Sequence, residues 1–303
     1  MIPFQKLTFT LYTGEFYMST HKFNLDSIDT QCFIDWDIDL LKVDNCNRGH
    51  PLNLRQEQSM MAKWRSLLPS NVILYNSRYG CMAKPNCHRK NVYGCRLGKY
   101  QRNYIVPQYC DQYCNMFRIT RDIEFSWSYI LDQVQARIGK SQQSKPGSWA
   151  DLDSLLPDSK VFTYQQQRSQ FSMWCILSSN LLISQDLTTL DSLQIAMLSN
   201  PIALQVNQQY FGDSGDLSFQ HGDLYVFTKV LKGEIAVLLV NFNEYSTVKW
   251  VVTNLGIIVK LCPNVTSCNA YNIWENTNTM LQIGQIVSIP PADSIFLTLS
   301  KCT

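Results

Sequence analysis

The sequence predicts an α/β protein of two domains: a (β/α)8 TIM-type barrel over residues 1–200, N-terminally incomplete, and an antiparallel β-sandwich over residues 201–303. Two observations support this prediction. Up to about residue 200, short β-branched or apolar runs alternate with longer helical patterns, which is the rhythm of βα units. From Ile202 onward, short strands follow one another between Gly, Asn and Asp turns.

The barrel domain alternates strand patterns with helix patterns. Predicted strands cover residues 7–12, 38–44, 72–76, 117–122 and 181–183, with a poorer pattern near Trp149. Between them, apolar residues recur three or four positions apart at Ile123, Trp127, Ile130, Val134 and Ile138, and again at Phe171, Trp174, Leu177 and Leu181. These stripes predict amphipathic helices whose apolar faces belong to the core.

The length of the first domain limits how much of a barrel it can hold. A (β/α)8 barrel takes roughly 250 residues, or about 31 for each βα unit, so this domain supplies about six units. Such a ring stays open and exposes two sheet edges. We therefore expect the first barrel strands to be missing, and a homodimer is one assembly that would cover the open edge.

The second domain is predicted from strand patterns alone. Runs typical of strands cover residues 224–230, 234–242, 246–253 and 294–300, with turn residues between them. A domain of roughly a hundred residues with this pattern is typical of an antiparallel β-sandwich.

The composition is that of an ordinary globular protein. Charged residues make up 17% of the chain, the formal net charge is +2, and aromatic residues reach 12%. Lys and Arg are scattered, so no basic patch predicts a nucleic-acid or membrane surface. No run approaches about eighteen continuous apolar residues, so no membrane span is predicted.

Cysteine usage favours a lysosomal or secreted protein. The chain has 11 cysteines, and its sequon, Asn264-Val265-Thr266, lies between Cys262 and Cys268. The first residues, MIPFQKLTF, lack the apolar core of a signal peptide. Two interpretations remain: a cytosolic protein, or a chain whose true beginning has been lost. The odd cysteine count favours the second, because one thiol is left without a partner.

Two aspartates at strand ends are candidates for chemistry. Lys42 and Asp44 lie two apart on a predicted strand, so both side chains point to one face, and barrel active sites form at the carboxyl ends of strands. Arg118 lies on a later strand and Asp122 where that strand meets a helix. Such aspartates are more often turn or helix-capping residues. A retaining glycosidase, however, needs two carboxyl groups about 5 Å apart, one ionised and one protonated, and Lys42 favours the ionised form of Asp44.

Other chemistries find less support in the sequence. A zinc site could be sought among Cys81, Cys87, His88, Cys95, Cys110 and Cys114. Their spacings match no paired C-x2-C pattern, so structural disulfides are favoured. Only four histidines are present, and neither a G-x-S-x-G turn nor a Gly-rich phosphate loop is found.

The segments DWDIDLLKVDNC and CNMFRITRDIEFSW carry a family resemblance. The first is similar to the nucleophile signature, and the second to the acid/base segment, of the melibiase-type α-galactosidase and α-N-acetylgalactosaminidase family. The resemblance implies that Asp44 attacks the anomeric carbon, that Asp122 is the acid/base, and that Arg118 holds the sugar.

Further segments extend the resemblance over nearly the whole chain. GSWADLD, YQQQRSQFSMWCILSSNLLISQDL, LSNPIALQVNQ and TFTLYTG are all similar to family segments. They imply substrate contacts for Tyr12 and Asp153, and Lys42 is a further substrate-binding candidate beside Asp44. Arg78 stands where the galactosidases carry Glu and the acetamido enzymes carry Ser. It is either a further sugar contact or an exposed loop residue, and the sugar stays unassigned.

The sequence also departs from the family pattern. Nothing before TFTLYTG matches the first two barrel strands, so the family's paired aspartates of strand two have no counterpart. Thr20 stands where the family has the disulfide partner of the residue at Cys46. Cys262 and Cys268 resemble a family hairpin disulfide.

The expected function is therefore a retaining glycoside hydrolase that releases terminal α-linked galactose, or N-acetylgalactosamine, from glycolipids, glycoproteins or oligosaccharides. The mechanism passes through a glycosyl-Asp44 intermediate and needs no metal or other cofactor. One alternative is a catalytically inactive, truncated relative that at most binds sugar or a protein partner. A small-molecule-binding β-sandwich is a third interpretation, but it leaves both catalytic motifs unexplained.

Overall fold

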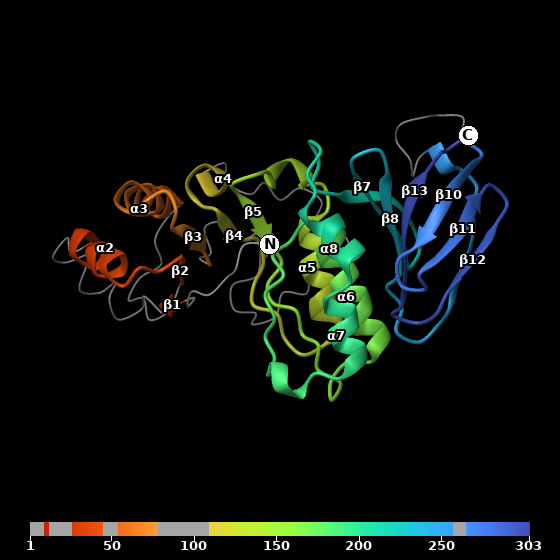
Figure 1. The fold of residues 1–303 in the computed structure, drawn as a ribbon, viewed down its shortest axis with the longest axis horizontal. Coiled ribbons are helices and arrows are strands. Elements are labelled where there is room, and N and C mark those ends of the chain that lie inside the picture. Colours follow the sequence, from red (N-terminus) through yellow and green to blue (C-terminus); the bar gives the residue numbers. More distant parts are fainter. Residues whose placement is uncertain (1–8, 12–25, 45–53, 78–108, 257–264) are drawn as a thin grey trace, which may run out of the picture. The chain divides into compact units, whose positions relative to one another are not determined.

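The computed structural model describes residues 9–11, 26–44, 54–77, 109–256 and 265–303, which Figure 1 draws in colour. The chain forms two compact units. The first is Met1–Arg121 with Gly147–Asp151, and the second is Asp122–Pro146 with Leu152–Thr303. The first unit holds a parallel sheet, and the second holds helices and the antiparallel sheets.

The parallel sheet follows the order of the chain. Its strands are β1 Phe9–Leu11, β2 Leu40–Val43, β3 Ile73–Asn76, β4 Met116–Arg118 and β5 Trp149–Asp151, each paired in parallel with the next. Helices α2 Asp26–Asp35, α3 Leu54–Leu67 and α4 Tyr109–Tyr113 lie between successive strands in the sequence. This order confirms the predicted α/β architecture, including the poorly patterned strand near Trp149.

The predicted strand over residues 117–122 is too long, because β4 ends at Arg118. The Ile119 N–H still donates to the backbone oxygen of Asp151, at 3.4 Å. The pairing stops there, since the next amide of that neighbouring segment, Leu152, donates to a side-chain hydroxyl at 3.0 Å instead. Asp122 consequently lies in the connection that follows β4 and not at the end of the strand.

The helices of the second unit carry the predicted apolar stripes. They are α5 Trp127–Arg137, α6 Tyr164–Ile176, α7 Ser192–Leu198 and α8 Pro201–Gln208. Trp127, Ile130 and Val134 are buried on α5, as are Phe171 and Trp174 on α6, so these stripe positions are core as expected. The stripe positions beyond the helix ends are only half-buried: Ile123, Ile138 and Leu181. Among the described residues, no helix is both long and apolar enough to cross a membrane.

The predicted strand over residues 181–183 is reduced to a single parallel bridge between Leu155 and Ile183. The Leu155 N–H donates to the Leu182 oxygen at 2.7 Å, and the Ser184 N–H donates to the Leu155 oxygen at 3.0 Å. The segment therefore pairs in parallel, as a barrel strand would, but over too few residues to count as a strand.

The remainder of the second unit is antiparallel, as predicted. Its strands are β6 Asp216–His221, β7 Leu224–Val230, β8 Ile235–Asn241, β9 Val248–Val251, β10 Ser267–Asn272, β11 Thr277–Gln282, β12 Ile286–Ile289 and β13 Ser294–Ser300. They form a six-stranded sheet in the order β11-β10-β13-β8-β7-β6 and a two-stranded sheet of β12 and β9. Leu239, Trp250, Val287 and Leu297 belong to the apolar cluster between these strands.

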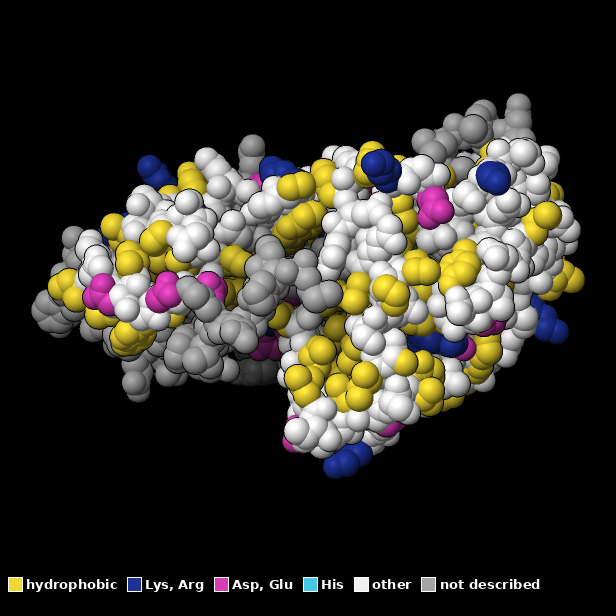
Figure 2. All heavy atoms as spheres, in the orientation of Figure 1, with side chains coloured by type: hydrophobic (Ala, Val, Ile, Leu, Met, Phe, Trp, Pro, Cys, Tyr) yellow, Lys and Arg dark blue, Asp and Glu magenta, His cyan; other side chains and the backbone are white. Residues whose placement is uncertain are grey.

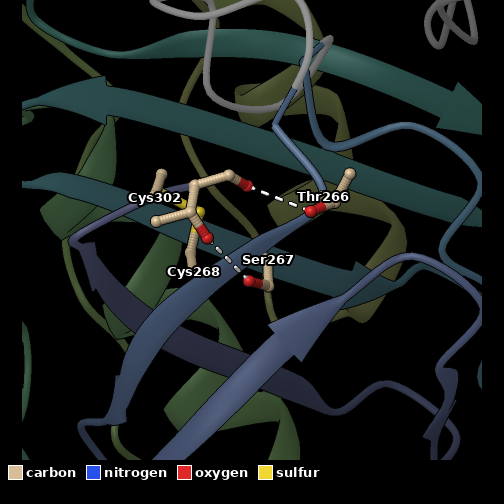
Figure 3. The surroundings of a disulfide bond; sticks show 5 residues. Thr266, Ser267, Cys268 and Cys302 are labelled. Atoms are coloured by element: carbon tan, nitrogen blue, oxygen red, sulfur yellow. Dashed lines mark hydrogen bonds between the residues drawn. A yellow bond between two sulfur atoms is a disulfide. The ribbon is translucent and has the colours of Figure 1, made fainter.

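The disulfide of this region joins Cys268 to Cys302, so the predicted Cys262–Cys268 pairing is wrong. The antiparallel register of β10 with β13 places Asn269 opposite Ser300, which brings the two cysteines together although 34 positions separate them. Cys262 lies outside the described residues. Figure 3 shows this bond together with the hydrogen bonds that join the hydroxyl groups of Thr266 and Ser267 to Thr303.

Other cysteines differ in state. Cys110 is also disulfide-bonded, whereas Cys114 and Cys175 are buried free thiols and Cys32 is an exposed one. Burial raises the pKa of the Cys114 thiol to about 12, so this sulfur stays protonated at neutral pH.

Within the described ranges, no group of three or more His, Cys, Asp or Glu side chains could hold a metal ion.

Candidate active site

One face of the parallel sheet collects the polar side chains of the site. Lys42 lies opposite Tyr75, which lies opposite Met116, and Met116 lies opposite Trp149. Because side chains alternate along a strand, residues two positions further on, such as Asp151, point to the same face. The other face carries Val43, Asn76, Phe117 and Ala150. The sheet thus has one face that carries Lys42, Tyr75, Arg118 and Asp151, which we call the chemical face, and another that is mostly apolar.

Lys42 and Asp44 form an ion pair at the carboxyl end of β2. The ammonium Nζ of Lys42 lies 3.8 Å from Oδ2 of Asp44, and the two side chains are 22% and 21% exposed. The same Nζ lies 5.2 Å from the centroid of the Tyr75 ring, which is a cation–π distance. The predicted same-face placement of Lys42 and Asp44 therefore brings a carboxylate, an ammonium and an aromatic ring together.

Asp151 is a fully buried carboxylate on this face. The Tyr75 hydroxyl donates to Oδ2 of Asp151, and Nε of Arg118 donates to the same oxygen at 3.2 Å. Arg118 is 2% exposed and Asp151 is fully buried. Burial, and secondly the negative charge of Asp151, raise the pKa of Tyr75 far above its usual range. The hydroxyl therefore stays a hydrogen-bond donor at any physiological pH.

Sequence reasoning missed Asp151 and Tyr75. Asp151 lies in the segment GSWADLD, in which the family resemblance points only to Asp153. A signal was present, because Asp151 and Arg118 end neighbouring strands of an α/β sheet and an arginine there needs an anionic partner. That signal becomes readable only when the order of the strands is known.

Asp122 and Asp153 lie in the second unit. Asp122 is exposed, and the N-cap of α5 is Ser126, so the helix-capping alternative for Asp122 is wrong. Oδ2 of Asp153 accepts the N–H of Ile123 at 2.7 Å. Its Oδ1 accepts the N–H of Ser154 at 2.8 Å. The Asp153 carboxylate thereby holds the backbone immediately after Asp122.

Asp153 itself is held firmly. Its φ of 75° lies in the left-handed region, which aspartate tolerates better than most residues. The indole Nε1 of Trp174 donates to its backbone oxygen at 2.7 Å. Because Trp174 is fully buried in α6, this contact fixes the turn that carries Asp153.

The structure thus groups the predicted site residues in two sets. Lys42, Asp44 and Arg118 share one face of the parallel sheet in the first unit, and Asp153 contacts the segment of Asp122 in the second. Tyr12 and Arg78 lie outside the described residues, as do Thr20, Cys46 and Asn264 of the sequon.

Comparison with known proteins identifies the family to which this chain is similar. The model of a family described as Alpha galactosidase A matches residues 7–209. Alpha-galactosidase A of Homo sapiens is 29% identical over 231 residues, which cover 73% of this chain and 49% of that protein. Alpha-N-acetylgalactosaminidase of Gallus gallus is 28% identical over 227 residues, 71% of this chain and 50% of that protein. The chain spans about half the length of these curated relatives.

A solved structure shows the same fold. Alpha-galactosidase I from Mortierella vinacea superimposes with a TM-score of 0.74 at 19% identity, over 92% of this chain and 72% of that one. The likeness therefore extends beyond the segment matched by the family model and includes the antiparallel region.

Proposed function

This chain belongs to the Alpha galactosidase A family, and from that membership we infer that it is a retaining glycoside hydrolase acting on terminal α-linked galactose or N-acetylgalactosamine. Membership makes it a glycosidase with a saccharide substrate. The observation that best supports the finer proposal is the Lys42–Asp44 pair at the carboxyl end of β2, with Nζ 3.8 Å from Oδ2. A carboxylate in that place, exposed enough to be reached and flanked by a cation, suits a nucleophile.

In the proposed mechanism, Asp44 attacks the anomeric carbon while Asp122 protonates the leaving glycosidic oxygen. The glycosyl-Asp44 ester is then hydrolysed by a water molecule from which Asp122 removes a proton. Two inversions at the anomeric carbon give net retention. The exposed position of Asp122 gives it the access to a water molecule that this second role requires.

Substrate binding is assigned to the remaining candidates. Arg118, whose Nε donates to Asp151, is proposed also to bind a sugar hydroxyl. Lys42 and Asp153 are proposed as further substrate contacts. Tyr12 and Arg78 are proposed from their sequence positions alone.

The fold proposal is more specific than the sheets themselves. We propose that β1 to β5 and the Leu155–Ile183 bridge belong to a (β/α)8 barrel over residues 1–200, of which this sequence provides about six βα units. Residues 201–303 are proposed as the separate sandwich domain. Because the chain spans about half the length of its relatives, a complete sugar pocket is likewise a proposal.

Assembly as a homodimer is proposed from an exposed apolar surface. Leu187, Leu193 and Ile195 are 62%, 59% and 52% exposed. Figure 2 shows hydrophobic side chains gathered over the region of α7. Surfaces of this kind are often covered by another chain.

A lysosomal or secreted location is proposed from the cysteines. The Cys268–Cys302 bond and the oxidised state of Cys110 suit an oxidising compartment. Glycosylation at Asn264 would accompany that route.

An inactive relative that binds sugar or a partner is the second candidate. The observation in its favour is the share of the relatives that the chain spans, about half their length. Barrel active sites take residues from several strand ends, and in this candidate too few of them come together for turnover. The two candidates differ in turnover and not in binding.

The test is hydrolysis of p-nitrophenyl α-galactoside and p-nitrophenyl α-N-acetylgalactosaminide by the purified chain. Asp44→Asn should abolish release of nitrophenol, and Glu234→Gln, in an exposed turn of the second unit, should not change it. Activity of wild type on one substrate alone would also choose the sugar. Retained turnover in Asp44→Asn would contradict the assignment of Asp44 as the nucleophile. If folded wild-type protein hydrolyses neither substrate, the inactive relative is favoured.

A further inference from the structure

We propose that Asp151 is the positioning residue of this site: it holds Arg118 directly, and through Tyr75 it holds Lys42 beside Asp44. This inference rests on the proposed function for its catalytic meaning. The contacts on which it is built are independent of that function.

The first step is the burial of the Asp151 carboxylate. It is fully buried on the chemical face of the sheet, where an ionised carboxylate is stable only with strong partners. Oδ2 receives both the Tyr75 hydroxyl and Nε of Arg118. Two donors from two different strands, β3 and β4, converge on one oxygen of a third, β5. Moving that oxygen moves both donors.

The second step runs through Tyr75. Its ring is 3% exposed, and its hydroxyl is fastened to Asp151, so the ring has one orientation. Nζ of Lys42 lies 5.2 Å from the ring centroid and 3.8 Å from Oδ2 of Asp44. The ring is therefore the support that keeps the ammonium next to the proposed nucleophile. The raised pKa of Tyr75 agrees with this role, since an ionised phenolate could not donate.

The third step concerns Arg118. Its Cα lies in register with that of Asp151, and the amide of the following residue, Ile119, donates to the Asp151 backbone oxygen at 3.4 Å. Side chain and backbone of Asp151 thus both hold the end of β4. A guanidinium bonded at Nε has a fixed plane, which is what a sugar-binding arginine needs.

A purely structural ion pair predicts a different outcome, and the chain offers a matched control. Asp293 pairs with Arg168 at 2.6 Å in the second unit, with side chains 10% and 22% exposed. Asp293→Asn weakens a largely buried pair without touching the chemical face. Asp151→Asn removes the charge but keeps an oxygen and the size of the side chain. Tyr75→Phe removes only the hydroxyl and keeps the ring.

The experiment records NMR spectra of full chains carrying 13C-labelled lysine, with the Lys42 ε-methylene signal assigned by Lys42→Arg. In wild type, the Tyr75 ring should shift that signal away from those of exposed lysines. The shift should shrink in Asp151→Asn and in Tyr75→Phe, and stay unchanged in Asp293→Asn. A Lys42 signal that is the same in all four proteins would overturn the proposal. Tyr75→Phe keeps the test open should Asp151→Asn fail to fold.

Kinetics supply the second readout on the same proteins. A displaced catalytic group commonly lowers turnover by about 100-fold, so Asp151→Asn should lose kcat to that extent while Asp293→Asn stays at the wild-type value. Equal kcat in Asp151→Asn and wild type would contradict the positioning role. Failure of wild type on both α-glycosides counts against the proposed function alone, because the Lys42 signal still decides the role of Asp151.

Discussion

The parallel sheet and the antiparallel region bury different kinds of side chain. In the parallel sheet, strands of three or four residues bury Tyr75, Arg118 and Asp151 on one face. In the antiparallel region, β8 is buried at all seven positions, six of them apolar. In the parallel sheet, charged groups are removed from water, and only partners at fixed distances can offset the free-energy cost of that desolvation. The comparison indicates that the antiparallel region supplies stability, whereas the parallel sheet carries the buried charges that surround the proposed nucleophile.

Removal of one charge should break the first region most severely. Arg118→Met leaves the Asp151 carboxylate buried without its cation, which we expect to cost about 3–5 kcal/mol in the free energy of unfolding. Arg168→Met, at the more exposed pair with Asp293, should cost less. Urea unfolding of both variants measures the difference. Equal losses of unfolding free energy would mean that the buried charges of the chemical face are no more costly to leave unpaired than those of the Arg168–Asp293 pair.

A substitution that creates a cavity tests the apolar core of the antiparallel region. Leu239→Ala, in the centre of β8, should cost about 2–5 kcal/mol, because it removes buried methyl groups and leaves a void. Thermal unfolding measures this loss, and Leu193→Ala at an exposed position of α7 is the control. We expect catalytic constants of the folded Leu239→Ala protein to match wild type. A selective loss of turnover would contradict the division of labour between the two regions.

The smallest expected effect concerns the one buried lysine of β7. Nζ of Lys229 donates to Ser178 Oγ at 2.6 Å and to the backbone oxygens of Val206 and Asn207, at 2.5 and 3.1 Å. Burial lowers its pKa to about 8 from 10.5. Between these values the unfolded chain binds more protons than the folded one, so this group makes the protein more stable as pH rises.

We therefore expect Lys229→Met to flatten the dependence of unfolding free energy on pH between 8 and 10.5. Exposed Lys232→Met should leave the slope unchanged. Lys140, whose pKa burial also lowers to about 8, contributes in the same window and is retained in both variants. A steeper slope in Lys229→Met would show that the sign is wrong.

What the sequence could predict depends on the range of the interactions involved. The alternation of β2 alone places Lys42 and Asp44 on one face, and the spacing of Trp127, Ile130 and Val134 alone defines the buried stripe of α5. These are local patterns. Four antiparallel strands, β7, β8, β9 and β13, are likewise readable from turn residues and short apolar runs, whereas β6, β10, β11 and β12 were not predicted.

The errors of sequence reasoning lie where distant segments meet. The partner of Cys268 is set by the pairing of β10 with β13, whereas the family resemblance implies Cys262. Asp151 gains its importance from Tyr75, which is 76 positions away. The length of β4 is set by where its neighbour β5 stops pairing. Each case depends on the register between strands, which cannot be deduced from a single sequence.

Trapping of the intermediate tests the central claim most directly. A 5-fluoro-α-galactosyl fluoride should glycosylate a retaining enzyme with loss of the anomeric fluoride, and the glycosyl-enzyme should then hydrolyse slowly. The ring fluorine destabilises both oxocarbenium-like transition states, but only the first step has the reactive fluoride as its leaving group. After denaturation and proteolysis, mass spectrometry should find the added sugar on the peptide containing Asp44 in wild type and nowhere in Asp44→Asn. A label on another carboxylate, or an unmodified Asp44 peptide from folded protein, would contradict the account.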